Sequence, residues 1–262
     1  MSQYQENATI IRFEQLTDTN IRLTLQTEEI AAAAKPGQFV MIRTGKSKDP
    51  LLRRPFSIHQ TSSSGRIQIL FKVTGRGTAL LSHCKEGETL SVFGPLGHGF
   101  HIDPGKAACL IGGGMGIAPM LFLAKRICQI KKDTETDLII LGGRDRSEVE
   151  PLLADFNFLD IGLMVATDDG SYGRHGLVTD VMKTVSLPEN CTVYACGPEQ
   201  MMKEIFRQCR KTKTECQVSV ESAMACGMGA CLGCNMPARN NRYVHVCSDG
   251  PVFNAEDLEW NV

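Results

Sequence analysis

Four cysteines near the end of the chain have a spacing that could hold an inorganic cluster. Residues 221–237 read ESAMACGMGACLGCNMP, and VCSDGPVF follows, so that Cys226, Cys231, Cys234 and Cys247 form the pattern C-x4-C-x2-C-x12-C. This is the spacing of plant-type [2Fe–2S] ligands. A cluster with four thiolates is anionic, and the glycines between these cysteines would let backbone N–H groups turn toward its sulfurs. The pattern therefore predicts metal ligation by these four side chains.

Two other uses of these cysteines remain open. A tetrahedral zinc site usually contains two C-x2-C pairs, and only one pair has that spacing here. Disulfides are disfavoured because we find no secretory signal and expect a reducing, cytoplasmic location. The other seven of the eleven cysteines are scattered, and for most of them we expect the role of a small buried apolar side chain: Cys84, Cys109, Cys128, Cys191, Cys196, Cys209 and Cys216.

A second motif combines a cation, a ring and a hydroxyl. Residues 51–59 read LLRRPFSIH. The guanidinium of Arg54 can bind a phosphate through two hydrogen bonds, and Pro55 fixes the strand so that Phe56 can stack on a flat ring. The hydroxyl of Ser57 could then bond a ring nitrogen. A solvated turn at the end of a strand is the alternative for this motif.

Two glycine-containing turns could bind phosphates. Gly77 and Thr78 could begin a short helix whose first amides bind a pyrophosphate. Farther on, CLIGGGMGIAP lies between an apolar strand and a helix, where glycine lets the backbone approach a pyrophosphate. Its spacing departs from G-x-G-x-x-G, and a purely structural turn is the alternative. The glycines of this turn are Gly112, Gly113, Gly114 and Gly116.

Two further stretches lie where a parallel sheet would bind a nucleotide. YACGP, residues 194–198, comes between a strand and a helix, and Cys196 there could lie against a nicotinamide ring. After another strand come Arg144, Asp145 and Arg146. The carboxylate could accept a hydrogen bond from a ribose hydroxyl, as in NAD sites, whereas either arginine could bind the 2′-phosphate of NADP.

These motifs need two kinds of domain to position them. Residues 1–100 contain six short runs rich in Ile, Val, Phe and Thr, which predict a closed antiparallel Greek-key β-barrel. In residues 101–218 apolar strands alternate with helices, which predicts a parallel five- to six-stranded α/β sheet covered on both faces. Residues 219–262 hold the cysteine loop and a predicted hairpin. The expected fold is therefore multidomain, β plus α/β, with a small C-terminal [2Fe–2S] domain.

Composition restricts the partners. Hydrophobic residues make up 42% of the chain and charged residues 22%, with a formal net charge of −1, so we expect neither a nucleic-acid nor an anionic-membrane partner. Residues 107–124 carry no charge over a length close to that of a membrane helix. They include four glycines and a proline, which favour a strand, a turn and a helix start instead.

The motifs, in this order along essentially the whole chain, resemble those of the ferredoxin–NADP reductase superfamily. Within it, the C-terminal cluster and the ending CSDGPVF are similar to the electron-transfer subunits of NAD-dependent (class 1B) dihydroorotate dehydrogenases. The resemblance implies that FAD binds Arg54, Pro55, Phe56, Ser57, Leu70, Phe71, Lys72, Gly77 and Thr78. It implies that NAD binds the turn with Gly112, Gly113, Gly114 and Gly116 and also Cys196, Gly197 and Pro198, and that Cys226, Cys231, Cys234 and Cys247 ligate the cluster. Phe56 replaces a frequent tyrosine, which keeps the stacking but loses a phenolic hydrogen bond.

The resemblance also implies a function. Ser57, Cys196 and Glu221 are expected near the reacting rings, which they would orient. NAD+ accepts a hydride and a cluster passes single electrons, and a flavin between them can do both. The expected partner is an FMN-containing catalytic subunit that oxidises dihydroorotate to orotate in pyrimidine biosynthesis, in a two-plus-two heterotetramer.

Two alternatives stay open at this point. One is the small subunit of another iron–sulfur flavoprotein of the ferredoxin:NADP reductase type. In the bifurcating members of that group an aspartate usually replaces the first cysteine, whereas this chain has Cys226. The other is a redox-sensing module, which would bind NADH without turnover.

Overall fold

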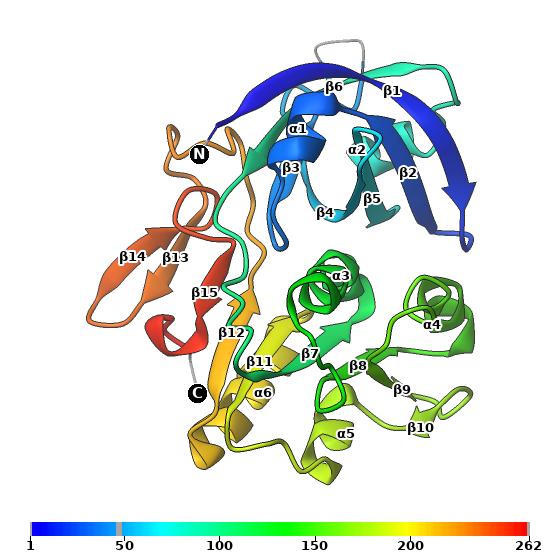
Figure 1. Cartoon of the computed structure of the whole chain (residues 1–262). Coiled ribbons are helices and arrows are strands. Elements are labelled where there is room, and N and C mark those ends of the chain that lie inside the picture. The colour runs from blue at the N-terminus through cyan, green and yellow to red at the C-terminus, as the bar shows by residue number, and fades with distance from the viewer. Residues whose placement is uncertain (1, 46–48, 261–262) are drawn as a thin grey trace.

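The N-terminal part of the chain is a closed barrel of antiparallel strands in the computed structural model, which describes residues 2–45 and 49–260 (Figure 1). Its strands follow one another around the barrel in the order β1-β2-β5-β4-β3-β6. They are β1 (Tyr4–Gln15), β2 (Asn20–Gln26), β3 (Phe39–Ile42), β4 (Arg54–Ser62), β5 (Arg66–Lys72) and β6 (Thr89–Leu96). The predicted barrel is confirmed. Two short helices, α1 (Glu28–Ala33) and α2 (Arg76–Leu81), lie between strands.

Alternation along the strands explains why this part closes into a barrel. On β2 and β5, Leu23 pairs with Ile69 and Leu25 with Ile67, and all four side chains are fully buried. Residues two apart on a strand point to the same face, so these apolar side chains fill the interior.

The middle of the chain forms a sheet in the order β10-β9-β8-β7-β11-β12-β15. All neighbouring strands are parallel except β15, which runs antiparallel to β12. The predicted parallel sheet is confirmed, and its seventh strand is an addition from the C-terminal segment. The strands are β7 (Ala107–Gly113), β8 (Leu138–Gly143), β9 (Gly162–Thr167), β10 (Arg174–His175), β11 (Cys191–Cys196), β12 (Glu215–Ser219) and β15 (Val252–Asn254).

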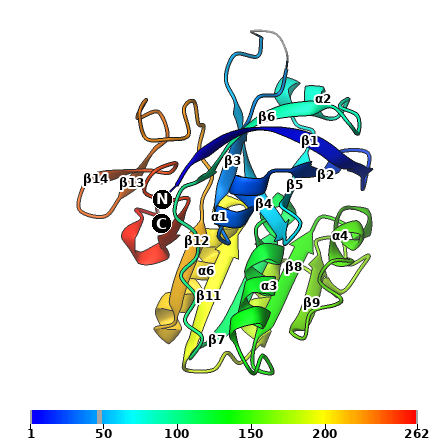
Figure 2. The same ribbon diagram turned by 45° about the horizontal axis from the view of Figure 1, so that its top comes forward.

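Helices cover both faces of this sheet. Side chains of α3 (Met120–Ile130) and α4 (Arg146–Leu153) share one apolar cluster, and those of α5 (Val178–Thr184) and α6 (Glu199–Thr212) share the other. Figure 2 shows α3 lying against the sheet beneath the barrel. The uncharged stretch 107–124 forms β7, the 3₁₀ helix η1 (Gly114–Ile117) and the start of α3. Within residues 2–45 and 49–260, no helix has the length and apolar character needed to cross a membrane.

The C-terminal segment is divided between a hairpin and the sheet. The predicted hairpin is confirmed as β13 (Asn235–Ala238) and β14 (Arg242–His245), and the chain then returns to β12 through β15 and the 3₁₀ helix η2 (Ala255–Asp257). The cysteine loop before the hairpin packs on the barrel, because a Cβ at Gly227 would lie 2.5 Å from Cγ of Met41 on β3.

The connection between barrel and sheet is held at several points. Phe100 N–H donates to Pro36 O in the barrel (2.9 Å). The backbone of His101 is bonded at both groups by the amide side chain of Gln217 on β12, at 2.9 and 2.8 Å, and its carbonyl also accepts from Tyr194 on β11 (3.1 Å). The connecting segment is therefore bonded both to the barrel and to the sheet.

Candidate functional site

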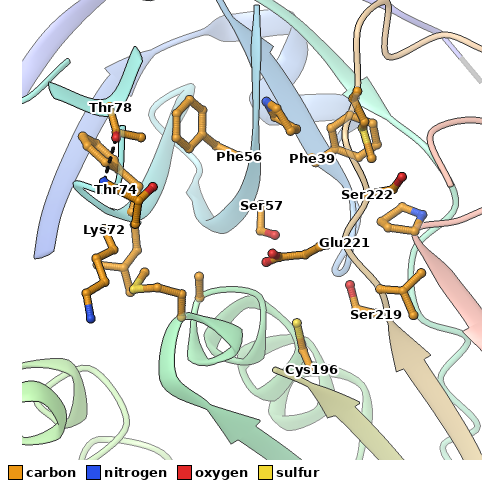
Figure 3. Close-up of a pocket in the computed structure, with 18 residues that line it drawn as sticks. Phe39, Phe56, Ser57, Lys72, Thr74, Thr78, Cys196, Ser219, Glu221 and Ser222 are labelled. Carbon is orange, nitrogen blue, oxygen red and sulfur yellow. Dashed lines mark hydrogen bonds between the residues drawn. The ribbon is translucent and has the colours of Figure 1, made fainter. Parts of the chain in front are cut away.

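The barrel and the α/β part enclose a cavity of about 290 Å³ between them (Figure 3). Strands β4 and β5 and the start of α2 line it from the barrel side. The ends of β11 and β12 and the turn after β7 line it from the other side. The structure brings together here most of the residues predicted to bind FAD: Pro55, Phe56, Ser57, Leu70, Phe71, Lys72 and Thr78.

Phe56 forms part of the cavity wall. Its side chain is only 7% exposed, and its ring packs tilted against Phe71 with the ring centroids 5.4 Å apart. The sequence suggested a ring free to stack on a ligand. The structure instead shows a ring that belongs to the barrel core and presents part of its surface to the cavity.

Arg54 and Gly77 lie beside the cavity and not in its lining. A Cβ at Gly77 would come within 3.0 Å of Arg54 Nε, so the glycine makes room for the guanidinium. The turn before α2 is ordered by Thr78, whose hydroxyl oxygen accepts from the N–H groups of Thr74 and Gly75 at 3.0 and 3.1 Å. The predicted phosphate-binding residues therefore lie close together, with Thr78 in the cavity lining and Arg54 and Gly77 beside it.

Ser57, Cys196 and Glu221 come from three different elements and face the same cavity (Figure 3). Ser57 is on β4, Cys196 ends β11, and Glu221 follows β12. Burial, with the Glu221 carboxylate nearby, raises the pKa of Cys196 to about 12. Cys196 is thus a neutral thiol that can contact a ring but cannot act as a thiolate nucleophile.

A second cavity of about 320 Å³ adjoins the first and shares Met115, Val220 and Glu221 with it. The glycine turn after β7 and the CGP turn after β11 line it together, with Gly113, Gly114, Gly116, Gly197 and Pro198. This is the point where the strand order reverses, between β7 and β11, and where such sheets bind ligands.

Gly112 differs from the other predicted nucleotide-binding glycines. It lines none of the cavities described here, and a Cβ on it would lie 3.1 Å from Cα of Ile117. Its lack of a side chain lets η1 pack on β7, so the structure gives it a packing role.

A groove of about 480 Å³ continues from the glycine turn toward β8 and β9. Asp145, expected to meet a ribose, does not line it. Its carboxylate instead caps α4, accepting from Glu148 N–H (3.0 Å) and from the Ser147 hydroxyl (2.6 Å). Three carboxylates do line the groove, those of Glu148, Asp168 and Glu204, and Asp168, after β9, was not among the residues singled out from the sequence. Its position just beyond the carboxyl end of a parallel strand was the available signal.

This difference leads to a prediction. Asp168→Ala should raise the KM for NADH about tenfold, because one hydrogen bond to a charged group is lost. Asp145→Ala should lower the Tm through loss of the helix cap and leave that KM within about twofold of the parent value. Steady-state dye reduction by NADH and thermal unfolding of both variants measure this. If Asp145→Ala raises the KM for NADH more than Asp168→Ala does, the ribose binds at Asp145, as expected from the sequence.

Cys226, Cys231 and Cys234 in the loop and Cys247 just after the hairpin are free thiols that lie near one another. Cys234 and Cys247 are buried, with their sulfurs 3.2 Å apart, and Cys231 is exposed. Backbone N–H groups point at three of the sulfurs. Those of Met228 and Cys231 donate to Cys226 Sγ at 3.4 Å, that of Gly229 to Cys247 Sγ at 3.2 Å, and that of Cys247 to Cys234 Sγ at 3.4 Å. Positive φ angles of 75° and 81° at Gly227 and Gly229 permit this wrapping.

The environment of the loop favours anionic sulfur at its start. Burial opposes ionisation of Cys226, but the N–H groups of Met228 and Cys231 outweigh it and lower its pKa to about 6. Burial and the neighbouring Cys234 raise the pKa of Cys247 to about 12. Over the described residues, no three His, Cys, Asp or Glu side chains are already gathered as metal ligands. The donor set nevertheless fits an iron–sulfur cluster, because N–H groups surround several soft thiols that form no disulfide.

The cysteine loop begins at the edge of the first cavity. Ser222 and Met224 line that cavity, and Cys226 follows two residues later, a span of about 7 Å at most. Phe39 lines the cavity from β3, the strand whose Met41 contacts Gly227. The cavity and the cysteines are therefore direct neighbours.

A flavin barrel, a nucleotide sheet and a cluster loop around shared cavities define an iron–sulfur flavoprotein oxidoreductase of the ferredoxin-reductase type. Three family models match successive parts of the chain. The oxidoreductase FAD-binding domain matches residues 9–101, and the oxidoreductase NAD-binding domain matches residues 110–207. The iron–sulfur cluster binding domain of dihydroorotate dehydrogenase B matches residues 221–259. The chain belongs to the family of dihydroorotate dehydrogenase B (NAD(+)) electron transfer subunits.

Curated relatives with that name match this chain over most of their length. The protein of Geobacillus thermodenitrificans is 37% identical over 261 residues, which cover 97% of this chain and 98% of the relative. That of Caldanaerobacter subterraneus subsp. tengcongensis is 43% identical over 228 residues, covering 85% and 86%. The chain is thus an oxidoreductase subunit with FAD-, NAD- and iron–sulfur-binding domains, as predicted, and an electron transfer subunit implies a catalytic partner.

Solved structures agree on the fold. The NADH-dependent reduced ferredoxin–NADP oxidoreductase, studied for flavin-based electron bifurcation, contains a chain with a TM-score of 0.85 at 28% identity; the match covers 98% of this chain and 91% of that one. A ferredoxin NADP+ reductase from Neisseria gonorrhoeae with bound FAD and NADP has a TM-score of 0.66 at 18% identity, with coverage of 79% and 91%. The second likeness concerns the fold alone.

Proposed function

We propose that this chain carries electrons from a partner that oxidises dihydroorotate to orotate, through a [2Fe–2S] cluster and FAD, to NAD+. One observation supports the proposal above the others: residues from the barrel, from the glycine and CGP turns and from the start of the cysteine loop line adjoining cavities. The flavin supplies the chemistry of accepting single electrons and delivering a hydride.

The residues have separate tasks in this proposal. Arg54, Gly77 and Thr78 hold the FAD phosphates, and Ser57 and Lys72 bond its polar edge. Leu70, Phe71 and Phe56, together with Pro55, form its apolar wall. The glycine turn and Cys196–Pro198 hold the dinucleotide, and the neutral thiol of Cys196 and the Glu221 carboxylate orient the nicotinamide. Cys226, Cys231, Cys234 and Cys247 hold the cluster.

The domain limits belong to the same proposal. We assign residues 1–100 to FAD, 101–218 to the dinucleotide and 219–262 to the cluster; Met1 and residues 46–48 and 261–262 lie outside the described part. The last of these domains shares a sheet with the second, because β15 pairs with β12. The cytoplasmic location also remains part of this proposal.

The partner is proposed to dock over the cysteine loop. Met228 and Leu232 are 50% and 58% exposed and flank Cys231, whose side chain is exposed as well. Apolar side chains exposed in this way beside an electron-carrying centre favour contact with another protein. The partner is an FMN-containing catalytic subunit, and the assembly is a two-plus-two heterotetramer.

Co-expression with an FMN-dependent dihydroorotate dehydrogenase tests this proposal. The purified complex should form NADH when dihydroorotate and NAD+ are added. The double variant Met228→Glu, Leu232→Glu should lose about 90% or more of that activity and elute apart from the partner, because charges replace apolar contacts in the interface. Its reduction of dyes by NADH should stay at the parent rate.

The matched control is Phe158→Glu. Phe158 is 90% exposed but lies beyond α4, far along the chain from the cysteine loop. It should leave assembly and turnover unchanged. Full assembly of the loop variant would contradict the proposed docking surface, and NADH binding without dye turnover by the parent would favour a redox sensor instead.

A further inference from the structure

Glu148 on α4 holds two cations that line the dinucleotide groove. Its Oε1 accepts from Lys72 Nζ at 2.9 Å, and its Oε2 accepts from the N–H of Arg144 at 3.0 Å and lies 3.4 Å from Arg144 Nε. All three residues line the groove, and the Glu148 side chain is only 13% exposed. The Glu148 carboxylate therefore contacts the cationic side chains of two elements: Lys72 on β5 and Arg144 in the turn after β8.

Glu148 carries its charge in this position. Burial opposes ionisation, but the N–H of Arg144 and the ammonium of Lys72 outweigh it and lower the pKa of Glu148. The local charge is thus balanced by neighbours inside the groove. A phosphate that needed the Arg144 guanidinium would have to displace this carboxylate first, whereas the Lys72 ammonium keeps two further N–H donors for the flavin cavity.

The groove places these groups beside the adenosine half of a dinucleotide. Met115 and Lys72 belong both to the groove and to the flavin cavity, which marks the nicotinamide end. The other end is lined by Arg144 after β8 and by Asp168 after β9. In sheets of this kind the ribose of the adenosine lies at the carboxyl end of the second strand, where an acidic residue accepts from its 2′-hydroxyl or an arginine binds a 2′-phosphate.

We propose that Glu148 determines the choice of dinucleotide, by holding Arg144 and Lys72 so that the groove accepts NAD and disfavours NADP. This inference rests on the proposed binding of the dinucleotide in the groove and adds its specificity. A 2′-phosphate would meet two carboxylates, Glu148 and Asp168, while the guanidinium that suits it is engaged. A 2′-hydroxyl can donate to a carboxylate and needs no cation.

A purely structural role for Glu148 has a different signature. The Lys72–Glu148 pair joins the barrel to α4, so its loss could loosen the two parts. Such loosening would weaken both dinucleotides alike and lower the Tm, because neither effect depends on a 2′-phosphate. The ratio of the kcat/KM values for NADPH and NADH separates the two roles.

Glu148→Gln is the main test, with dye reduction as the assay. The ratio of kcat/KM for NADPH to that for NADH should rise at least tenfold, mainly through a lower KM for NADPH, because Arg144 becomes free to bind the phosphate. Adding Arg144→Ala to this variant should remove the gain. The matched control is Glu150→Gln on the same helix, whose partner Arg146 lies 2.8 Å away and outside the groove lining, and its ratio should equal that of the parent.

A second variant keeps the inference testable if Glu148→Gln fails to fold. Arg144 is 70% exposed, so Arg144→Ala should fold normally. Because Glu148 already engages Arg144 in the parent, this single change should alter the ratio less than threefold. A larger fall would overturn the inference, as would an unchanged ratio in folded Glu148→Gln or an equal rise in Glu150→Gln.

Gly114 distinguishes failure of this inference from failure of the proposed site. Gly114 has φ of 55°, a region that Asn and Asp tolerate, and open space lies around its Cβ position. Gly114→Asp should raise the KM for both dinucleotides at least tenfold more than Gly114→Asn does, because its charge faces their phosphates. If it does not, the proposed site is wrong; if it does and the Glu148→Gln ratio is unchanged, only the role of Glu148 is wrong.

Discussion

Replacing Cys234 by serine is expected to abolish dihydroorotate-dependent NADH formation by the complex, with a loss of about hundredfold or more. Cys234 is 1% exposed, and its sulfur lies 3.2 Å from that of Cys247. A serine hydroxyl is a harder donor that stays protonated at neutral pH, so it cannot replace a thiolate on iron. Iron and acid-labile sulfide should fall in parallel, as should the visible absorbance of the cluster.

Reduction of dyes by NADH should persist in the same variant, within about threefold, because it needs the FAD and dinucleotide sites and not the cysteine loop. Cys128→Ser serves as the control. Cys128 is half-buried on α3, and this variant should keep its iron. Zinc in place of iron in the parent protein would contradict the assignment, and so would loss of both activities together.

Among alanine substitutions of the glycines in the turns after β7 and β11, Gly116→Ala is expected to cause the largest loss of stability. The added Cβ would lie 2.1 Å from the carbonyl oxygen of Cys196 and 2.5 Å from Gly197 N, and both of these are backbone atoms. Overpacking against backbone costs about 3 kcal/mol, which corresponds to roughly 6–12 °C in Tm for a chain of this length. The KM for NADH should rise about tenfold or more, because the two turns that line the second cavity are pushed apart.

Gly114→Ala is the matched control for that substitution. No atom lies within 4 Å of its Cβ position, so the change costs only the strain of a positive φ, about 1 kcal/mol. Thermal unfolding followed by circular dichroism compares the two variants. Equal Tm values would mean that the turns after β7 and β11 do not touch as the structure has them.

Local patterns were sufficient for the barrel, the parallel strands and the hairpin. In strands such as β5, buried and partly exposed residues alternate within the strand itself, and glycines mark the turns between strands. The pairing of β15 with β12 could not be predicted in this way, because it joins Val218 to Phe253 across 35 positions and β15 is only three residues long. Helix α1 was missed for a similar reason, since a helix of six residues has almost no period to detect.

The candidate site was predictable where chemistry depends on residue type, as with the cysteines and the residues around Arg54. It was not predictable where two uses compete for one residue. Asp145 has the type and place of a ribose-binding acid, but N-capping of α4 engages its carboxylate first. Gly112 has the type of a phosphate-binding glycine, and the structure adds a second reason for glycine there, the close packing of Ile117. The contact that matters is at a helix end for Asp145 and is a tertiary contact for Gly112, and neither can be recognised from the sequence alone.

The hydrogen bonds around His101 have a consequence for the pace of electron flow. Gln217 and Tyr194 secure the connecting segment to the sheet and Gly227 rests on Met41 of the barrel, so the regions assigned to FAD and to the cluster are joined by direct contacts. Tunnelling between centres depends steeply on their separation, and these contacts favour one fixed separation between FAD and the cluster. We therefore expect turnover to be limited by arrival and departure of the nicotinamide or by the partner, and not by hinge motion inside this subunit.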